Sequence, residues 1–272
     1  MDKPMKGIAC AGCPHRAAYV VTKDALGRGR GRVICGDAGC AAVGALHPAA
    51  TACPGGQERL LPRYNKPVPA GTANEPGSEA CVRFVRAEQV VYGAASDGEP
   101  GFSAAEMAGC GRVAVLAVTA SSAAYVEDAA LSELVDRLRE LGYGCIAMAD
   151  PFDTLGSGEL IGEALAADGV SAVVFASPCA RLTRRVPLAP AEVDRYSCVG
   201  CQRCVQILGC PALSFAPPAA AIDADACAGC DLCRDYCRTH VILSVRARMT
   251  PEERRHERYA SARGSYKREA CS

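Results

Sequence analysis

Two runs of closely spaced cysteines in the last third of the chain are the residues best suited to do chemistry. The first run has the spacing Cys-x2-Cys-x2-Cys-x5-Cys-Pro, and its members are Cys198, Cys201, Cys204 and Cys210. The second run has the spacing Cys-x2-Cys-x2-Cys-x3-Cys, and its members are Cys227, Cys230, Cys233 and Cys237. Three thiolates on one tight loop can each bind a different iron of one iron–sulfur cube. The spacing therefore predicts two [4Fe–4S] clusters that carry electrons.

The spacing matches the run of bacterial ferredoxins, in which the fourth cysteine binds the cluster of the other run. The set expected for the first cluster is Cys198, Cys201, Cys204 and Cys237. The set expected for the second cluster is Cys227, Cys230, Cys233 and Cys210. Two zinc knuckles are the alternative, although zinc usually takes four cysteines as two separated pairs. A purely structural cluster is another. Arg238 stands where the second run usually has Pro, a position that supplies no ligand.

Strands that alternate with helices precede these runs. The predicted strands are residues 112–119, 145–149 and 172–176, and the predicted helices are residues 125–141 and 158–167. This alternation indicates an α/β domain with a doubly wound parallel sheet. We therefore divide the chain into an α/β domain (1–187), a ferredoxin-like α+β module (188–245) and a charged tail (246–272).

The tail is expected to begin a helix at Thr250-Pro251, with Glu253 three residues after the threonine. Residues 246–268 hold eight Lys or Arg against three Glu. A solvated helix is the expected role, and a docking surface for an acidic electron-carrier protein is the alternative.

Composition excludes several classes of protein. Thirty basic residues balance thirty acidic ones, which argues against a general nucleic-acid binder. No apolar run approaches the ~18–20 residues of a membrane span. The N-terminal segment MDKPMKGIAC shows no signal-peptide core. We expect a cytoplasmic protein, in which 18 cysteines indicate metal rather than disulfides.

Several stretches together resemble a known family. They are CAGCPHRA (10–17), GDAGCAAVGALHP (36–48), ADPFD (149–153), ASPCARL (176–182) and the region from Cys198 to Ile242. They look like the C-terminal half of the alpha subunit of indolepyruvate:ferredoxin oxidoreductase. More broadly, they are similar to the thiamine-diphosphate subunits of 2-oxoacid:ferredoxin oxidoreductases, which implies a thiamine-diphosphate-domain-like sheet.

The resemblance implies further cofactors and partners. Many relatives bind a cluster near the thiamine cofactor, and the matching positions here are Cys10, Cys13, Cys40 and Cys179. The resemblance thus implies a third [4Fe–4S] cluster, against the alternative of four ordinary thiols. It also implies that ferredoxin or another redox protein, and a partner oxidoreductase subunit, bind this chain.

The diphosphate site of the family looks degenerate in this sequence. Relatives hold Mg²⁺ through an Asp in a Gly-Asp-Gly/Ser motif and an Asn at the end of the next strand, oxygen ligands that suit this ion. Ala94 stands at the Asp position, and Thr119-Ala120 stands where Asp-Asn is expected. The sequence therefore argues against bound thiamine diphosphate and Mg²⁺, and it identifies no catalytic residue.

The sequence is consistent with two functions. The first is an electron-transfer protein or subunit, and the second is an active thiamine-diphosphate-dependent oxidoreductase subunit acting on an aryl-pyruvate such as indolepyruvate. A redox sensor or scaffold ranks below both, because sensing needs only one cluster.

Overall fold

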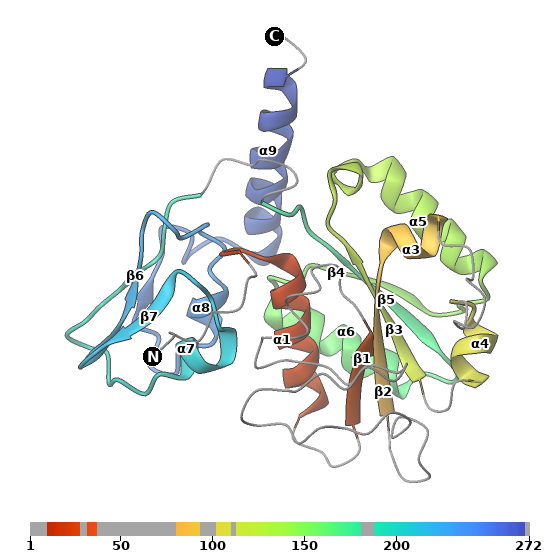
Figure 1. Ribbon diagram of the computed structural model, residues 1–272, viewed down its shortest axis with the longest axis horizontal. Coiled ribbons are helices and arrows are strands. Elements are labelled where there is room, and N and C mark those ends of the chain that lie inside the picture. Colours follow the sequence, from red (N-terminus) through yellow and green to blue (C-terminus); the bar gives the residue numbers. More distant parts are fainter. Residues whose placement is uncertain are drawn as a thin grey trace, which may run out of the picture.

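A computed structural model describes the fold. The described residues are 10–27, 32–36, 80–92, 102–109, 113–180 and 188–269. One parallel sheet has the strand order β1-β2-β3-β5-β4 (Figure 1). Its strands are β1 (Arg32–Gly36), β2 (Ala80–Arg86), β3 (Val113–Ala120), β4 (Ile146–Ala149) and β5 (Ser171–Ala176). The prediction of a parallel α/β sheet is confirmed.

Helices cover both faces of this sheet, as in a doubly wound fold. One face carries α1 (Pro14–Leu26) and α6 (Thr154–Ala166). The other face carries α3 (Ala87–Tyr92), α4 (Ala104–Gly109), the 3-10 turn η2 (Ala123–Val126) and α5 (Asp128–Glu140). On the α1 face, the ring of Tyr19 lies 4.4 Å from that of Phe84, which stacks on Phe175 at 6.1 Å. These aromatic contacts fix α1 against the sheet.

The expected strands and helices are present with differences in their bounds, and α1, β1 and β2 were not predicted. Strand β3 begins one residue after the predicted start, and the predicted helix over 125–141 is divided into η2 and α5. Helix α6 begins at Thr154, four residues before the predicted start at Gly158. The reason is an N-cap, since the Asp153 carboxylate accepts a hydrogen bond from the backbone N–H of Gly156 at 3.2 Å.

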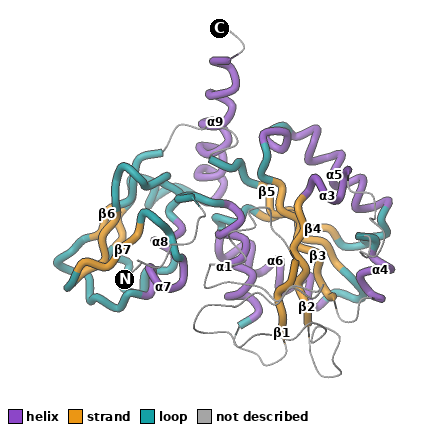
Figure 2. The backbone as a smooth tube through the Cα atoms, viewed as in Figure 1, coloured by secondary structure: helices purple, strands orange, loops and turns teal. Residues whose placement is uncertain are grey.

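The cysteine-rich part of the chain is built from two similar halves. Each half runs from a short strand through a cysteine loop and a short helix to a second strand. The first half contains β6 (Glu192–Val193), α7 (Arg203–Leu208) and β7 (Leu213–Ala216). The second contains β8 (Ala219–Ile222), α8 (Leu232–Asp235) and β9 (Ile242–Leu243). Because β6 pairs with β9 and β7 with β8, both antiparallel, the two halves are interlocked. Loops make up most of this part (Figure 2).

Helix α9 (Pro251–Glu269) follows and stands between the cysteine-rich part and the sheet (Figure 1). Its predicted start is confirmed: the backbone N–H of Thr250 donates to the Glu253 carboxylate at 2.7 Å, and the Thr250 hydroxyl accepts from the backbone N–H of Glu253 at 3.2 Å. Most of its first ten residues are exposed, as expected for a solvated helix, but one face is buried. Arg258, Tyr259 and Ala262 are buried, and the last two pack on Val126.

Among the described residues, no helix is both long and apolar enough to cross a lipid bilayer.

Candidate iron–sulfur centre

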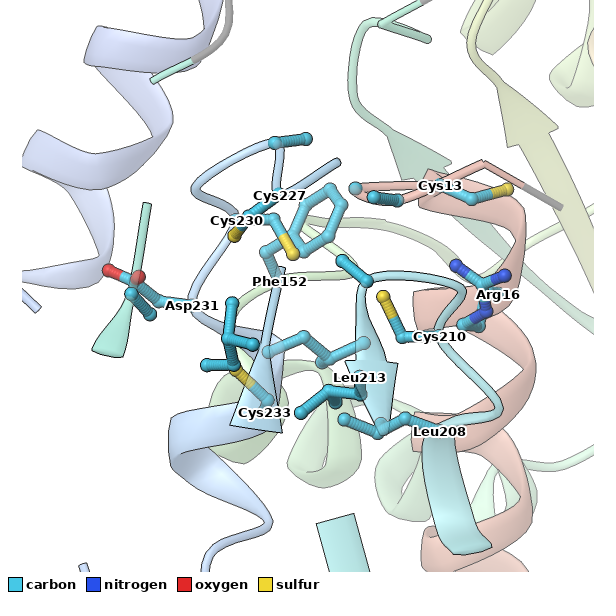
Figure 3. A pocket seen from close by; sticks show the side chains of 17 residues that line it. Cys13, Arg16, Phe152, Leu208, Cys210, Leu213, Cys227, Cys230, Asp231 and Cys233 are labelled. Atoms are coloured by element: carbon cyan, nitrogen blue, oxygen red, sulfur yellow. The ribbon is translucent and has the colours of Figure 1, made fainter. Parts of the chain in front are cut away.

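A cavity lies where the N-terminal end of α1 meets the cysteine-rich part (Figure 3). Its wall includes Cys210, Cys227, Cys230 and Cys233, and Arg16 lies on the α1 side. The cavity has a volume of about 30 Å³. This is more than the roughly 10–15 Å³ that one water molecule needs. Close-packed interiors leave few such voids, so this thiol-lined space has room for a bound group.

The structure brings the three loop cysteines of the second run together with the last cysteine of the first. Burial raises the pKa of the Cys233 thiol, and the nearby thiols of Cys230, Cys227 and Cys210 raise it further. Burial also raises the pKa of the Cys210 thiol, while the Arg16 guanidinium opposes this rise. Four thiols that disfavour each other's charge, with a cation beside them, form a donor set suited to a positively charged metal centre.

The three loop cysteines of the first run gather with Cys237 in the same way. Burial raises the pKa of the Cys204 thiol, and Cys237, Cys201 and Cys198 contribute to the rise. At Cys237, burial acts in the raising direction, but hydrogen bonds, led by that from the backbone of Val241, outweigh it and lower the pKa. The backbone around Cys237 is therefore shaped to receive a thiolate.

Two glycines allow the cysteine loops to close tightly. Gly200 and Gly229 have φ values of +66° and +62°, which side chains rarely adopt. A Cβ at Gly200 would lie 2.6 Å from the carbonyl oxygen of Pro218, and one at Gly229 would lie 2.5 Å from that of Ala189. The backbone N–H of Gly229 also points to the Cys227 sulfur at 3.5 Å. The same local geometry thus recurs in both loops.

The spacing of the cysteines bears on the choice between zinc and an iron–sulfur cluster. Zinc usually takes four cysteines as two separated pairs, whereas each set here has three cysteines from one loop and one from the other run. Within the part of the chain that the structure describes, no group of three or more His, Cys, Asp or Glu side chains is arranged to hold a metal ion. The spacing itself is typical of a ferredoxin-type cluster.

The third predicted set is described only in part, since Cys40 lies outside the described residues. Cys10 and Cys13 precede α1, and the Arg16 guanidinium donates to the Cys10 carbonyl oxygen at 2.5 Å. Cys179 follows β5, and its backbone N–H donates to the Ser121 carbonyl oxygen at 2.9 Å. Cys13 lines the cavity of the second set, a proximity that the spacing of the cysteines did not indicate.

The structure also describes only some of the residues that stand where the family has its diphosphate-site ligands. Ala94 lies outside the described residues. Thr119 lies in β3 with a 2% exposed side chain, and its hydroxyl donates to the Val85 carbonyl oxygen at 3.3 Å. This hydroxyl therefore bonds within the sheet.

Sequence reasoning missed the role of Asp150, in the ADPFD stretch. Asp150 forms a buried ion pair with Arg258 of α9, and Arg258 also lies 4.8 Å above the ring of Phe152, which lines the cavity. The signal available in the sequence was an acidic residue directly after a strand, but its partner is 108 residues away.

Fold and site together define a protein with a parallel α/β sheet and an interlocked cysteine-rich part that presents two four-thiol sets. The chain is similar to indolepyruvate oxidoreductase subunit IorA from several organisms. It is 34% identical to that of Thermococcus kodakarensis over 110 residues, which are 38% of this chain and 17% of the relative. For Pyrococcus horikoshii the identity is 33% over 116 residues, which are 40% and 18% of the two chains.

For Archaeoglobus fulgidus the identity is 28% over 116 residues, which are 41% of this chain and 19% of the relative. The chain therefore spans less than a fifth of the length of these curated relatives. These similarities support the family that the motifs suggested. No protein-family model matches the chain, and no solved structure matches it.

Proposed function

We propose that this chain is an iron–sulfur electron-transfer protein or subunit of the indolepyruvate:ferredoxin oxidoreductase type. The observation that carries the proposal is the exchange of cysteines between the two halves, in which Cys237 lies with the first run and Cys210 with the second. Two [4Fe–4S] clusters held by these sets would supply one-electron chemistry. A single structural metal would not need two interlocked four-thiol sets.

The difference in exposure between the two sets supports a site at which the chain exchanges electrons with a partner. Cys201 of the first set is exposed, whereas the second set lies against α1. We propose that a ferredoxin or another redox protein meets the chain near Cys201. The relatives are named as subunits, which supports a partner oxidoreductase subunit.

A third [4Fe–4S] cluster held by Cys10, Cys13, Cys40 and Cys179 is part of the proposal. The location of Cys13 on the wall of the cavity that the second set lines supports it, because a cluster held by Cys13 would lie next to the second set.

One alternative is an active thiamine-diphosphate enzyme, which the oxidoreductase name of the relatives favours. The hydrogen bond of Thr119 to Val85 counts against it, since that hydroxyl is already used in the sheet.

Metal and cofactor analysis of one anaerobically purified sample tests these proposals. We expect about eight irons and eight sulfides per chain for two clusters, or about twelve of each for three. Cys237→Ala should remove about four irons, whereas Cys145→Ala, at an exposed cysteine outside all three sets, should remove none. Zinc without sulfide would overturn the proposal, and stoichiometric thiamine diphosphate with Mg²⁺ would establish the alternative.

A further inference from the structure

We propose that five exposed side chains around the first cysteine set form the docking surface for an acidic electron-carrier protein. The docking surface consists of Arg195, Tyr196, Val199, Arg203 and Arg238. The inference rests on the proposed function, and it adds which side chains bind the partner and what charge the partner presents. One electron that crosses this surface oxidises the group in the first set and reduces the centre of the partner, and no bond is made or broken.

The two cysteine loops begin with the same turn, so their side chains can be compared position by position. Asp194 accepts hydrogen bonds from the backbone N–H groups two and three residues later, at 3.1 and 3.4 Å. Asp223 accepts the corresponding pair at 3.0 and 3.2 Å. Each aspartate precedes the first cysteine of its loop by four residues. Because the turns are alike, differences between the loops lie mainly in the side chains that they present.

The first loop exposes large apolar side chains where the second does not. The side chain of Tyr196 is fully exposed, and the residue at the same position of the second loop is Asp225. Val199 is 66% exposed, and its counterpart is Ala228. Side chains so exposed add little to the core, whereas tyrosine is enriched among the residues that dominate binding at protein interfaces. Tyr196 is therefore the expected anchor of the docking surface.

The charged part of the docking surface is basic. Its three arginines are exposed, and each lies within three residues of a cysteine in the first set. Two acidic residues, Glu192 and Asp194, lie in the same segment, and the Asp194 carboxylate is engaged in the turn. The second loop begins instead with two exposed aspartates, Asp223 and Asp225. A partner that presents carboxylates is thus steered to the first loop and away from the second.

The docking surface also surrounds the more accessible of the two sets. Cys201 is exposed, whereas Cys230, at the same position of the second loop, is half-buried. Strand β6, which leads into the first loop, lies on the side of the cysteine-rich part away from the parallel sheet (Figure 1). Redox proteins meet through small interfaces, below roughly 1,200 Å², so a few side chains around one loop suffice for a brief encounter.

Isothermal titration calorimetry under anaerobic conditions tests the inference with two probes of opposite charge. The first probe is a purified, oxidised two-cluster ferredoxin of net negative charge. The second is oxidised cytochrome c, a small basic electron carrier. We expect the ferredoxin to bind the iron-replete chain at low ionic strength and to bind more weakly as salt is added. We expect no binding of cytochrome c.

Variants locate the binding site. Tyr196→Ser should weaken the binding of the ferredoxin by at least about tenfold. Tyr92→Ser, at a tyrosine of α3 that is 76% exposed, is the matched control and should leave the affinity unchanged. Arg195→Gln and Arg238→Gln should each weaken binding about twofold to fivefold at low salt, and less at high salt. Arg139→Gln, at an exposed arginine of α5, should have no effect.

The outcomes separate this inference from the proposed function. Fewer than about eight irons in the unmodified chain would contradict the proposed function itself. With full iron content, three results would overturn the docking surface alone: no binding of the ferredoxin, equal affinities of Tyr196→Ser and Tyr92→Ser, or tighter binding of cytochrome c.

Two further measurements exclude other roles for Tyr196. Because its side chain is fully exposed, Tyr196→Ser should keep the iron content of the unmodified chain. A loss of iron would mean that this tyrosine supports the loop, and it would overturn the inference. Sedimentation of the chain alone at several concentrations tests for a second copy on the same surface. Self-association that Tyr196→Ser abolishes would also overturn the inference.

Discussion

Arg246 and Asp231 form a buried, bidentate ion pair that connects the segment before α9 to the second cysteine loop. The guanidinium donates to both carboxylate oxygens, at 3.0 and 3.1 Å, and the two side chains are 2% and 1% exposed. A second donor to Asp231 is the Ser244 hydroxyl at 2.8 Å, and Arg246 also donates to the Ala189 carbonyl oxygen at 2.6 Å. Because Asp231 has a φ of 62°, the pair also holds a left-handed residue inside the loop.

Asp231→Asn should destabilise the chain by about 3–5 kcal/mol, because it leaves the buried guanidinium with only the more distant Glu257 carboxylate, at 3.9 Å, as counter-charge. Asn tolerates the left-handed conformation, so backbone strain does not contribute. Asp136→Asn is the matched control, since Asp136 pairs with Arg139 on the exposed face of α5. It should change the free energy of unfolding by less than about 1 kcal/mol. Urea denaturation under anaerobic conditions measures both, and similar values for the two would contradict the prediction.

The ion pair between Arg258 and Asp150 predicts a pH dependence. Burial raises the pKa of the Asp150 carboxyl above its ordinary 3.8, and the Arg258 guanidinium opposes the rise without cancelling it. The folded chain then binds this proton more tightly than the unfolded chain. The stabilisation by this carboxyl is complete below pH 3.8 and is lost as the pH rises through the folded pKa.

We therefore expect the unmodified chain to gain stability relative to Asp150→Asn as the pH falls from neutral towards the ordinary pKa of a carboxyl. Urea unfolding at several pH values, at matched iron content, measures this difference. A difference that shrinks instead would mean that the attraction to Arg258 exceeds the effect of burial.

Substitution of the loop glycines should remove one set at a time. Gly229→Ala places a Cβ against the Ala189 carbonyl oxygen, and Gly200→Ala places one against that of Pro218. Each should lower the iron content from about eight to about four per chain. Gly158→Ala, in α6, meets no atom within 4 Å and should bind iron normally. Normal iron content in either loop variant would show that the loop can relax.

The cap at Thr250 should contribute measurably to the docking of α9. Thr250→Ala removes the acceptor for the backbone N–H of Glu253 and should destabilise the chain by about 0.5–2 kcal/mol. Thr250→Ser retains the hydroxyl and should remain close to the unmodified chain. Thermal unfolding followed by circular dichroism distinguishes the two variants, and equal losses would indicate that the cap adds nothing here.

Local patterns predicted three of the five strands of the sheet and missed β1 and β2. The apolar run that became β3 is bounded by Val113 and Ala120, one residue from the expected bounds. Continuous apolar segments of this length are typical of strands buried on both faces, so little else fits them. The start of α6 was misplaced because the cap at Asp153 was not considered, and apolar spacing alone locates helix ends poorly.

Contacts between distant segments could not be predicted. Arg246 and Arg258 were counted among the charges of a solvated tail, yet both are buried, and so is Arg16 of the CAGCPHRA stretch. Their partners are set by how α1, α9 and the cysteine loops meet, which no local pattern encodes. The contact between the Cys13 loop and the second cysteine set was missed for the same reason.

The exchange of Cys210 and Cys237 between the two halves has a consequence for biosynthesis. A ribosome makes the last member of the second set, Cys233, before the last member of the first set, Cys237. The first set is therefore completed after the second, although its three loop cysteines are translated first. These three thiols lack their fourth partner until most of the second half has been synthesised. During that interval the nascent chain exposes an incomplete set, which needs protection from oxidation until its fourth member emerges.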